Sequence, residues 1–176
     1  MNDRFHSSEL VFDGRVAKGY KVELRMPDGR IVQRDYFHYN GAVAVLPVLS
    51  DGSIVLIHNY RFAVDEHLLE IPAGMLEEGE DPADCAAREL AEETGYTAGR
   101  IERLGEFFTA PGTTDERMHA FLATDLADGE QNLEPYEEIR VEVRPETKVR
   151  EMAISGELHD GKTLAALALY WLRQAS

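Results

Sequence analysis

The chain has 176 residues, 44% of them hydrophobic and 29% charged, which fits a globular protein with a real core. Its 18 basic and 33 acidic residues give a formal net charge of −15, which argues against general binding to nucleic acid. The only cysteine is Cys85, and no apolar run of transmembrane length or signal peptide is recognisable. We therefore expect a cytoplasmic protein that has no disulfide and does not bind membranes.

Residues 1–40 predict a small antiparallel sheet. After a polar start at Met1–Ser8, the segments Leu10–Phe12, Val16–Arg25 and Ile31–His38 have strand patterns, and Met-Pro-Asp-Gly-Arg joins the last two. So small a sheet buries little apolar surface by itself. We expect these residues to pack against a partner subunit, so that the protein is a homodimer, and residues 41–176 to form the main domain.

The remaining chain alternates strands and helices, as in an α+β fold with a mixed sheet. The nearly continuous apolar run Gly41–Leu49 predicts a buried strand. Residues 109–116 are rich in turn formers, and 127–136 form an acidic loop. The other predicted strands are 54–59, 68–72, 101–108, 118–126 and 139–143, and the predicted helices are 82–94, 145–155 and 162–174.

Helix 82–94 has clear local signals at both ends. Asp81 is a favoured N-cap, Pro82 suits the first helical position, and Gly95 suits the position after the helix. Glu89 and Glu93 are four residues apart, so their like charges share one face and repel each other. A run of charge is usually a solvated helix face, which is the simplest interpretation of these glutamates.

A divalent cation would turn that repulsion into ligation, and carboxylate oxygens suit Mg²⁺ or Mn²⁺. Glu92 adds charge beside the pair. Arg88 lies four residues before Glu92 and can orient the carboxylates. Together with the helix signals, this spacing favours a metal site over a solvated face.

The stretch Gly74–Tyr96 has the pattern G-x5-E-x7-R-E-L-x-E-E-x-G-Y, which resembles the Nudix box apart from Tyr96 in place of an aliphatic residue. The resemblance implies the Nudix fold, an α/β/α sandwich, and metal-dependent hydrolysis of a nucleoside diphosphate linked to another group. It implies that the Ala73 carbonyl, Glu89 and Glu93 hold the metal. It also implies that Glu92 helps directly or through water, while Glu80 and Arg88 brace the loop and helix.

Three further matches resemble the ADP-ribose pyrophosphatases within that family. Pro111 lies 16 residues after Gly95 in a Thr-Ala-Pro-Gly loop, Asn59-Tyr60-Arg61 precedes the box, and Leu-Glu-Ile-Pro-Ala-Gly leads into it. Taken singly, Pro111-Gly112 is more typical of a turn and Arg61 of an ordinary surface arginine. The substrate-binding residues that the resemblance implies are Arg34, Arg61, Glu70, Pro111, Gly112 and Glu116.

The resemblance predicts Mg²⁺-dependent hydrolysis of ADP-ribose to AMP and ribose 5-phosphate, with Mn²⁺ able to substitute. One alternative is a pyrophosphatase for another nucleoside diphosphate sugar, such as GDP-mannose or UDP-glucose. Another is an inactive ligand sensor of the same fold, which would have no need for Glu89, Glu92 and Glu93 together.

The general base is expected in the acidic loop before the strand at 139–143. Glu137 best matches the family's catalytic or metal-binding glutamate, and Glu134 is the alternative, because Pro135 disturbs the register between them. A solvated acidic loop is the simpler interpretation of this stretch.

Overall fold

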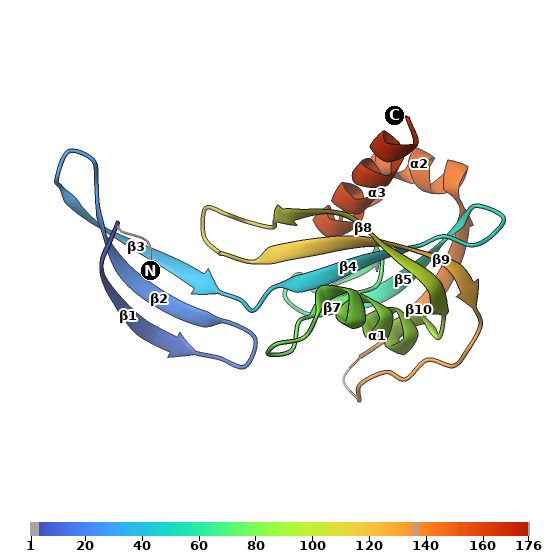
Figure 1. The fold of residues 1–176 in the computed structure, drawn as a ribbon, viewed down its shortest axis with the longest axis horizontal. Coiled ribbons are helices and arrows are strands. Elements are labelled where there is room, and N and C mark those ends of the chain that lie inside the picture. The colour runs from blue at the N-terminus through green and yellow to red at the C-terminus, as the bar shows by residue number, and fades with distance from the viewer. Residues whose placement is uncertain (1–3, 136, 176) are drawn as a thin grey trace. The chain divides into compact units, whose positions relative to one another are not determined.

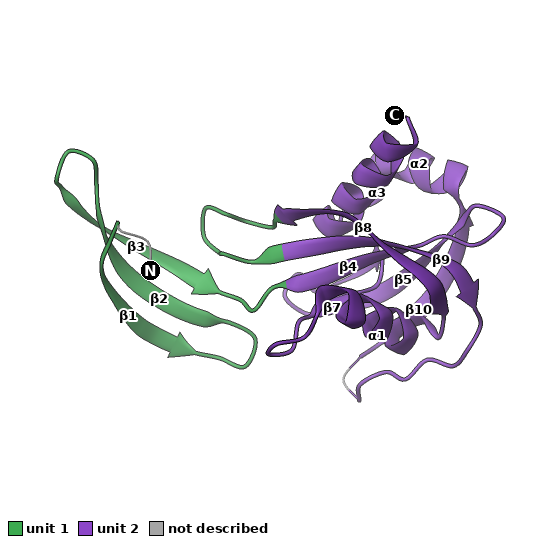
Figure 2. Cartoon of the chain, in the orientation of Figure 1, with its two compact units in different colours: residues 1–41, 108–117 green, residues 42–107, 118–176 purple. Residues whose placement is uncertain are grey.

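The computed structural model describes residues 4–135 and 137–175, which form two compact units (Figure 1 and Figure 2). Unit 1 comprises Met1–Gly41 and Phe108–Arg117, and unit 2 comprises Ala42–Phe107 and Met118–Ser176. The first three residues of the predicted polar start, and Tyr136 at the end of the predicted acidic loop, lie outside the described residues. Within the described ranges, no helix is long and apolar enough to span a membrane.

Unit 1 contains the predicted antiparallel sheet, in the order β1-β2-β3. Its strands are β1 (Phe5–Asp13), β2 (Lys18–Arg25) and β3 (Ile31–His38). The first strand begins at Phe5, within the predicted polar start, and not at Leu10, because β1 pairs with β2 along its whole length. The loop at residues 109–116, called the loop of unit 1 below, is hydrogen-bonded to the end of β3. There the Phe37 N–H donates to the Thr113 carbonyl at 2.9 Å.

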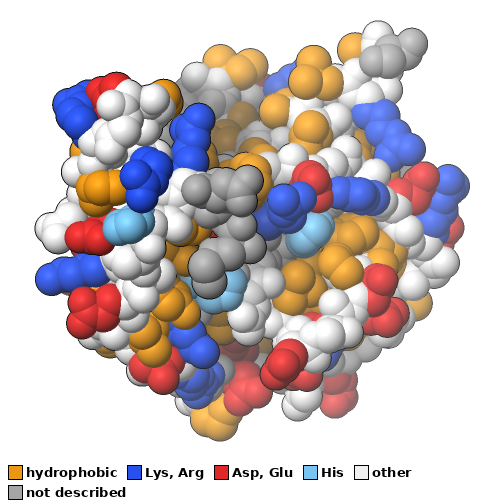
Figure 3. Space-filling view, turned by 60° about the vertical axis from the view of Figure 1, so that its left-hand side comes forward, with side chains coloured by type: hydrophobic (Ala, Val, Ile, Leu, Met, Phe, Trp, Pro, Cys, Tyr) orange, Lys and Arg blue, Asp and Glu red, His pale blue; other side chains and the backbone are white. Residues whose placement is uncertain are grey.

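The sheet of unit 1 buries little of its apolar surface. Val22 is the only hydrophobic residue of its described part that is less than a tenth exposed. Hydrophobic side chains reach the molecular surface between charged ones in Figure 3. The large exposed hydrophobic residues of β1 to β3 and their turns are Leu10, Val11, Phe12, Val16, Ile31 and Phe37.

Unit 2 holds two sheets and three helices. A four-stranded sheet has the order β7-β4-β9-β8, and a three-stranded sheet has the order β10-β5-β6. Strand β4 runs parallel to β9 and antiparallel to β7, so the sheet is mixed. The elements are β4 (Ala42–Pro47), β5 (Ser53–Arg61), β6 (Glu66–Glu70), β7 (Ala73–Met75), α1 (Pro82–Thr94), β8 (Thr97–Phe108), β9 (Arg117–Ala127), β10 (Ile139–Pro145), α2 (Glu146–Ser155) and α3 (Gly161–Gln174).

Strand β4 is buried on both faces and separates two hydrophobic clusters. Val43 and Val45 face a cluster that includes Cys85 and Leu90 of α1. Ala44 and its neighbours on the other face pack in a cluster with residues of α2 and α3. Successive strand side chains point to opposite faces, so α1 covers one face and α2 and α3 the other (Figure 1). The predicted α/β/α sandwich with a mixed sheet is confirmed.

Helix α1 has the ends that its sequence predicts. The Asp81 carboxylate accepts a hydrogen bond from the Ala83 N–H at 2.8 Å, and Pro82 is the first helical residue. Gly95 has a φ of 78°, in the left-handed region where glycine costs least. Cys85 is fully buried, and burial raises the pKa of its thiol to about 12, so it acts as a packing residue.

Strands β7 and β8 show the clearest differences in unit 2 from the sequence-based expectation. Strand β7 forms at Ala73–Met75, where no strand was predicted, because its backbone pairs with β4. Strand β8 begins at Thr97, directly after the Gly95 turn, and not at Ile101.

Candidate active site

Glu93 is the buried member of the acidic face of α1. Its side chain lies beneath the turn into β7, where the Ala73 N–H donates to Glu93 Oε2 at 2.9 Å, and the residue is 3% exposed. Burial, with repulsion from Glu89 and Glu137, raises its pKa to about 8 against the lowering effect of the Ala73 N–H. The same turn therefore carries the Ala73 backbone and a nearly buried carboxyl group, whose pKa stays raised although the charge of Arg61 lowers it.

Glu89 lies against Gly74, the first residue of the Nudix-like pattern. A Cβ atom at position 74 would overlap the Glu89 carboxylate, so a larger residue would displace that carboxylate from its present position. Burial raises the pKa of Glu89, Arg88 opposes that shift, and the charges of Glu92 and Glu137 add to it. Glycine in β7 thus allows the Glu89 carboxylate to approach the backbone closely at this position.

Arg88 joins the loop to the helix. Its Nε and Nη2 donate to the two carboxylate oxygens of Glu80, each at 3.0 Å, and Nη1 donates to Glu89 at 2.7 Å and to Glu92 at 3.1 Å. The fork to Arg88 lowers the pKa of Glu80 to about 2. Arg88 thus connects Glu80 of the loop to two of the carboxylates predicted to bind metal.

Of the two glutamates predicted as general base, Glu137 is the one near the acidic cluster on α1, which consists of Glu89, Glu92 and Glu93. Its charge acts on both Glu89 and Glu93. The Glu137 N–H donates to the Glu134 carbonyl, and the Glu134 N–H donates to the Glu137 carboxylate, both at 2.9 Å. Glu134 takes part in this turn through its backbone N–H and carbonyl, while its side chain is exposed.

The donor set at α1 fits a hard divalent cation. Across residues 4–135 and 137–175, no three His, Cys, Asp or Glu side chains are already gathered closely enough to hold a metal ion. Arg88 and the Ala73 N–H take up carboxylate oxygens of Glu89 and Glu93. Burial is the first cause of the raised pKa of both carboxyls, and the neighbouring carboxylates add to it. Oxygen donors of this kind suit a hard divalent cation.

Arg61 is held at the end of β5 by a buried carboxylate. Its Nε and Nη2 donate to Glu70 at 2.9 and 2.6 Å, and the Glu70 side chain is 1% exposed while that of Arg61 is 39% exposed. The Glu70 fork raises the pKa of Arg61, and the charge of Glu93 adds to the shift. Arg61 is therefore a fixed cation near the acidic cluster and not an ordinary surface arginine.

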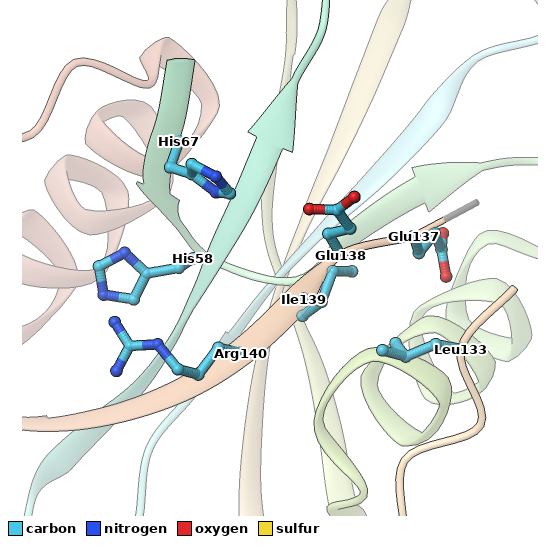
Figure 4. A pocket seen from close by; sticks show the side chains of 7 residues that line it. All are labelled: His58, His67, Leu133, Glu137, Glu138, Ile139 and Arg140. Atoms are coloured by element: carbon cyan, nitrogen blue, oxygen red, sulfur yellow. The ribbon is translucent and has the colours of Figure 1, made fainter. Parts of the chain in front are cut away.

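A cavity of about 570 Å³ opens beside Glu137, and its lining is shown in Figure 4. His58, His67 and Arg140 come from three neighbouring strands, and the carboxylates of Glu137 and Glu138 point in different directions. A polar ligand group in this cavity would meet both nitrogen-bearing side chains and the carboxylates of Glu137 and Glu138. The remaining lining residues are Leu133 and Ile139.

Four of the predicted substrate-binding residues belong to unit 1. Arg34 lies on β3 and donates to the Gln33 carbonyl at 2.8 Å. Pro111, Gly112 and Glu116 lie in the loop of unit 1, where Glu116 accepts a hydrogen bond from the Thr109 hydroxyl at 2.6 Å. The structure brings Arg61, Glu70 and the box glutamates together in unit 2, and leaves these four as predictions.

Several residues that support the site carry no sequence signal. Gln131 Nε2 donates to the Glu93 carbonyl at 2.6 Å, and the Asn132 N–H donates to the Glu92 carbonyl at 3.0 Å. These bonds anchor the acidic loop to the end of α1. Lys162 and Thr163 contact the segment before the box from 92 residues away, a separation that no local pattern reveals.

The α/β/α fold and the Gly74–Tyr96 pattern, with Arg88 holding the acidic face of α1, are those expected of a Nudix protein. The chain belongs to this family, because the NUDIX domain model matches residues 38–167.

Similar proteins agree with this assignment. An ADP-ribose pyrophosphatase of Bacillus subtilis is 37% identical over 99% of this chain and 96% of its own length. A GDP-mannose pyrophosphatase of Salmonella arizonae is 33% identical over 82% of each chain. The solved structure of an ADP compounds hydrolase superposes with a TM-score of 0.82 at 24% identity and covers 98% of this chain and 95% of the other, which shows the shared fold.

Proposed function

We propose that the protein is a Mg²⁺-dependent pyrophosphatase that hydrolyses ADP-ribose to AMP and ribose 5-phosphate. The observation that carries the proposal is that Glu93 interacts both with a fixed cation, Arg61, and with the carboxylates of Glu89 and Glu137. The relative from Bacillus subtilis supports the choice of ADP-ribose. The single buried thiol also agrees with our proposal that the protein works in the cytoplasm.

Glu89 and Glu93, with the Ala73 carbonyl, are the residues that would hold Mg²⁺, and Glu92 would assist. Bound there, the cation would supply Lewis-acid chemistry and neutralise charge on the diphosphate. Arg88 keeps Glu89 and Glu92 oriented through its hydrogen bonds.

Arg61 would hold a phosphate oxygen of the substrate. Glu70 fixes two of its nitrogens, so the guanidinium is oriented before substrate arrives. Glu137 would accept a proton from the attacking water, because its charge acts on Glu89 and Glu93. Carboxylates that bind the cation would be too weakly basic for this role. Glu134 remains the alternative base.

GDP-mannose is the second candidate substrate, favoured by the relative from Salmonella arizonae. A substrate panel separates the candidates. We expect the kcat/KM for ADP-ribose to exceed those for GDP-mannose, UDP-glucose and ATP when products are quantified at saturating Mg²⁺. Equal values for ATP and ADP-ribose would contradict the proposed specificity, and a higher value for GDP-mannose would move the assignment to that substrate.

The protein is also proposed to be a homodimer, with unit 1 packed against the partner subunit. The exposed apolar side chains of β1 to β3 support this, because a sheet with one buried hydrophobic residue gains stability by covering that surface. Arg34, Pro111, Gly112 and Glu116 would then contribute to a substrate site completed by the partner.

The expected result for assembly is a molar mass of two chains in light scattering at assay concentration. Substituting Phe12 with serine removes an exposed apolar group of β1, and we expect this variant to shift toward monomer and to lose activity together. A fully active wild-type monomer would contradict the homodimer.

A further inference from the structure

The first turn of α3 is joined to Glu70 by a buried ion pair. Lys162 Nζ donates to Glu70 Oε2 at 2.6 Å, and the two side chains are 12% and 1% exposed. The same oxygen also accepts from Arg61 Nη2 at 2.6 Å. Glu70 therefore holds two cations, one facing the interior and one facing the acidic cluster.

A second link runs in parallel through the N-cap of α3. Asp160 accepts from the Thr163 N–H at 3.0 Å and from the Thr163 hydroxyl at 2.5 Å, and it pairs with Lys162 at 3.0 Å. Thr163 Oγ1 in turn accepts from the Ile71 N–H at 2.9 Å. Consecutive residues of the segment before β7 are thus fixed by one helical turn, Glu70 through its side chain and Ile71 through its backbone.

The contact between Lys162 and Glu70 affects how firmly Glu70 holds the Arg61 guanidinium. Glu70 would be free to follow Arg61 toward solvent if Arg61 were its only partner. Lys162 is a second donor to the carboxylate, at the oxygen that Arg61 Nη2 also uses. A side chain whose rotamer is locked by a second layer of hydrogen bonds keeps its partner in place more precisely than a single ion pair does.

From this network we infer that Lys162 is a positioning residue, which sets the location of Arg61 for an anionic group of the substrate by anchoring Glu70. The inference rests on the proposed function, in which Arg61 binds a substrate phosphate. Lys162 itself touches neither the box glutamates nor Ala73 in the contacts of the described chain.

The test compares Lys162→Met, Lys162→Arg and wild type. The methionine variant removes the charge at similar length, and we expect the KM for ADP-ribose to rise about tenfold to a hundredfold, the usual range for residues that orient a ligand. The kcat should change far less, because a misplaced Arg61 weakens binding of substrate and transition state alike. Lys162→Arg should restore most of the affinity.

Lys148→Met is the matched control. Lys148 lies on α2, has a half-exposed side chain and pairs only weakly with Glu151 at 3.4 Å, so its loss should leave both kinetic constants unchanged. A purely structural role for Lys162 would lower the active fraction and hence kcat, with KM unchanged. That result, or wild-type constants in Lys162→Met, would overturn the inference.

A buried carboxylate that loses one cation can unfold the chain. The Glu70→Gln/Lys162→Met variant removes both charges together and is compared with Glu70→Gln alone. Equal KM values are expected, since Lys162 acts through Glu70, and a further rise in the double variant would overturn the inference.

Calorimetric binding of ADP-ribose in EDTA repeats the comparison without catalysis, and Lys162→Met should again bind more weakly than wild type. A wild-type chain that binds ADP-ribose in EDTA but does not cleave it in Mg²⁺ would refute the proposed function, while the effect of Lys162 on binding would still decide the inference. A wild-type chain that neither binds ADP-ribose in EDTA nor cleaves it in Mg²⁺ would overturn both.

Discussion

Glu93→Gln is expected to lower kcat for ADP-ribose by about 10²–10³-fold and, at the same time, to stabilise the metal-free protein. The amide keeps an oxygen for the Ala73 N–H but removes a buried charge that faces Glu89 and Glu137. Loss of the charge weakens cation binding and the activity that depends on it. Steady-state kinetics at saturating Mg²⁺ and thermal unfolding in EDTA measure the two effects.

The stability effect should depend on pH in a defined direction. The pKa of Glu93 is raised from 4.5 to about 8 in the folded state, so the folded chain holds this proton more tightly than the unfolded chain. The metal-free wild type should therefore lose stability as pH rises between those values, and Glu93→Gln should lose less. Each kcal/mol of difference corresponds to about 2–4 °C in melting temperature for a chain of this size.

Glu151→Gln on α2 is the matched control for this experiment, because its side chain is 71% exposed and remote from α1 in the fold. It should match wild type in rate and in melting temperature. Wild-type turnover in Glu93→Gln would show that the buried carboxylate is not part of the metal site. A lower melting temperature of Glu93→Gln in EDTA would contradict the claim that the buried Glu93 charge destabilises the metal-free protein.

Glu137→Gln should also have a large effect, a decrease in kcat of about 10²–10⁴-fold with a smaller change in KM. Glu137 is the loop glutamate whose charge acts on both Glu89 and Glu93. Removing a proton acceptor affects the chemical step more than substrate binding. The variant should also lose the acid limb of the pH–rate profile, which kcat measurements across the active pH range detect.

Glu134→Gln is the matched comparison, since Glu134 shares the same turn through its backbone but has an exposed side chain. We expect it to retain near wild-type kcat. If Glu134→Gln alone abolishes turnover, the base is Glu134. If neither substitution matters, Glu116 in the loop of unit 1 is the next candidate.

Most of α1 and its acidic face could be predicted because the determining signals are local. Asp81, Pro82 and Gly95 set the ends of the helix through contacts within a few residues. The spacing of Glu89 and Glu93 places both on one face, whatever the rest of the chain does. The structure adds that Glu93 is buried while Glu89 is only partly buried. The periodicity of the sequence cannot predict this difference in burial.

The parts that could not be predicted depend on contacts between distant segments. The sequence places Glu70 in a predicted strand, within the Leu-Glu-Ile-Pro-Ala-Gly motif. It does not reveal that the partners of Glu70 are Arg61 on β5 and Lys162 on α3. Gln131 lies in a loop whose composition suggests only solvation, and it anchors that loop to Glu93. Strand β7 is too short for an alternating pattern and forms because β4 offers a backbone edge.

The central claim is that the acidic cluster on α1 performs metal-dependent hydrolysis of a diphosphate, and product analysis with ADP-ribose tests it most directly. Purified protein is incubated with ADP-ribose in Mg²⁺ or in EDTA, and the products are separated and identified by mass. The account predicts equal amounts of AMP and ribose 5-phosphate in Mg²⁺ and neither product in EDTA. Cleavage that continues in EDTA, or intact ADP-ribose in the presence of Mg²⁺, would contradict it.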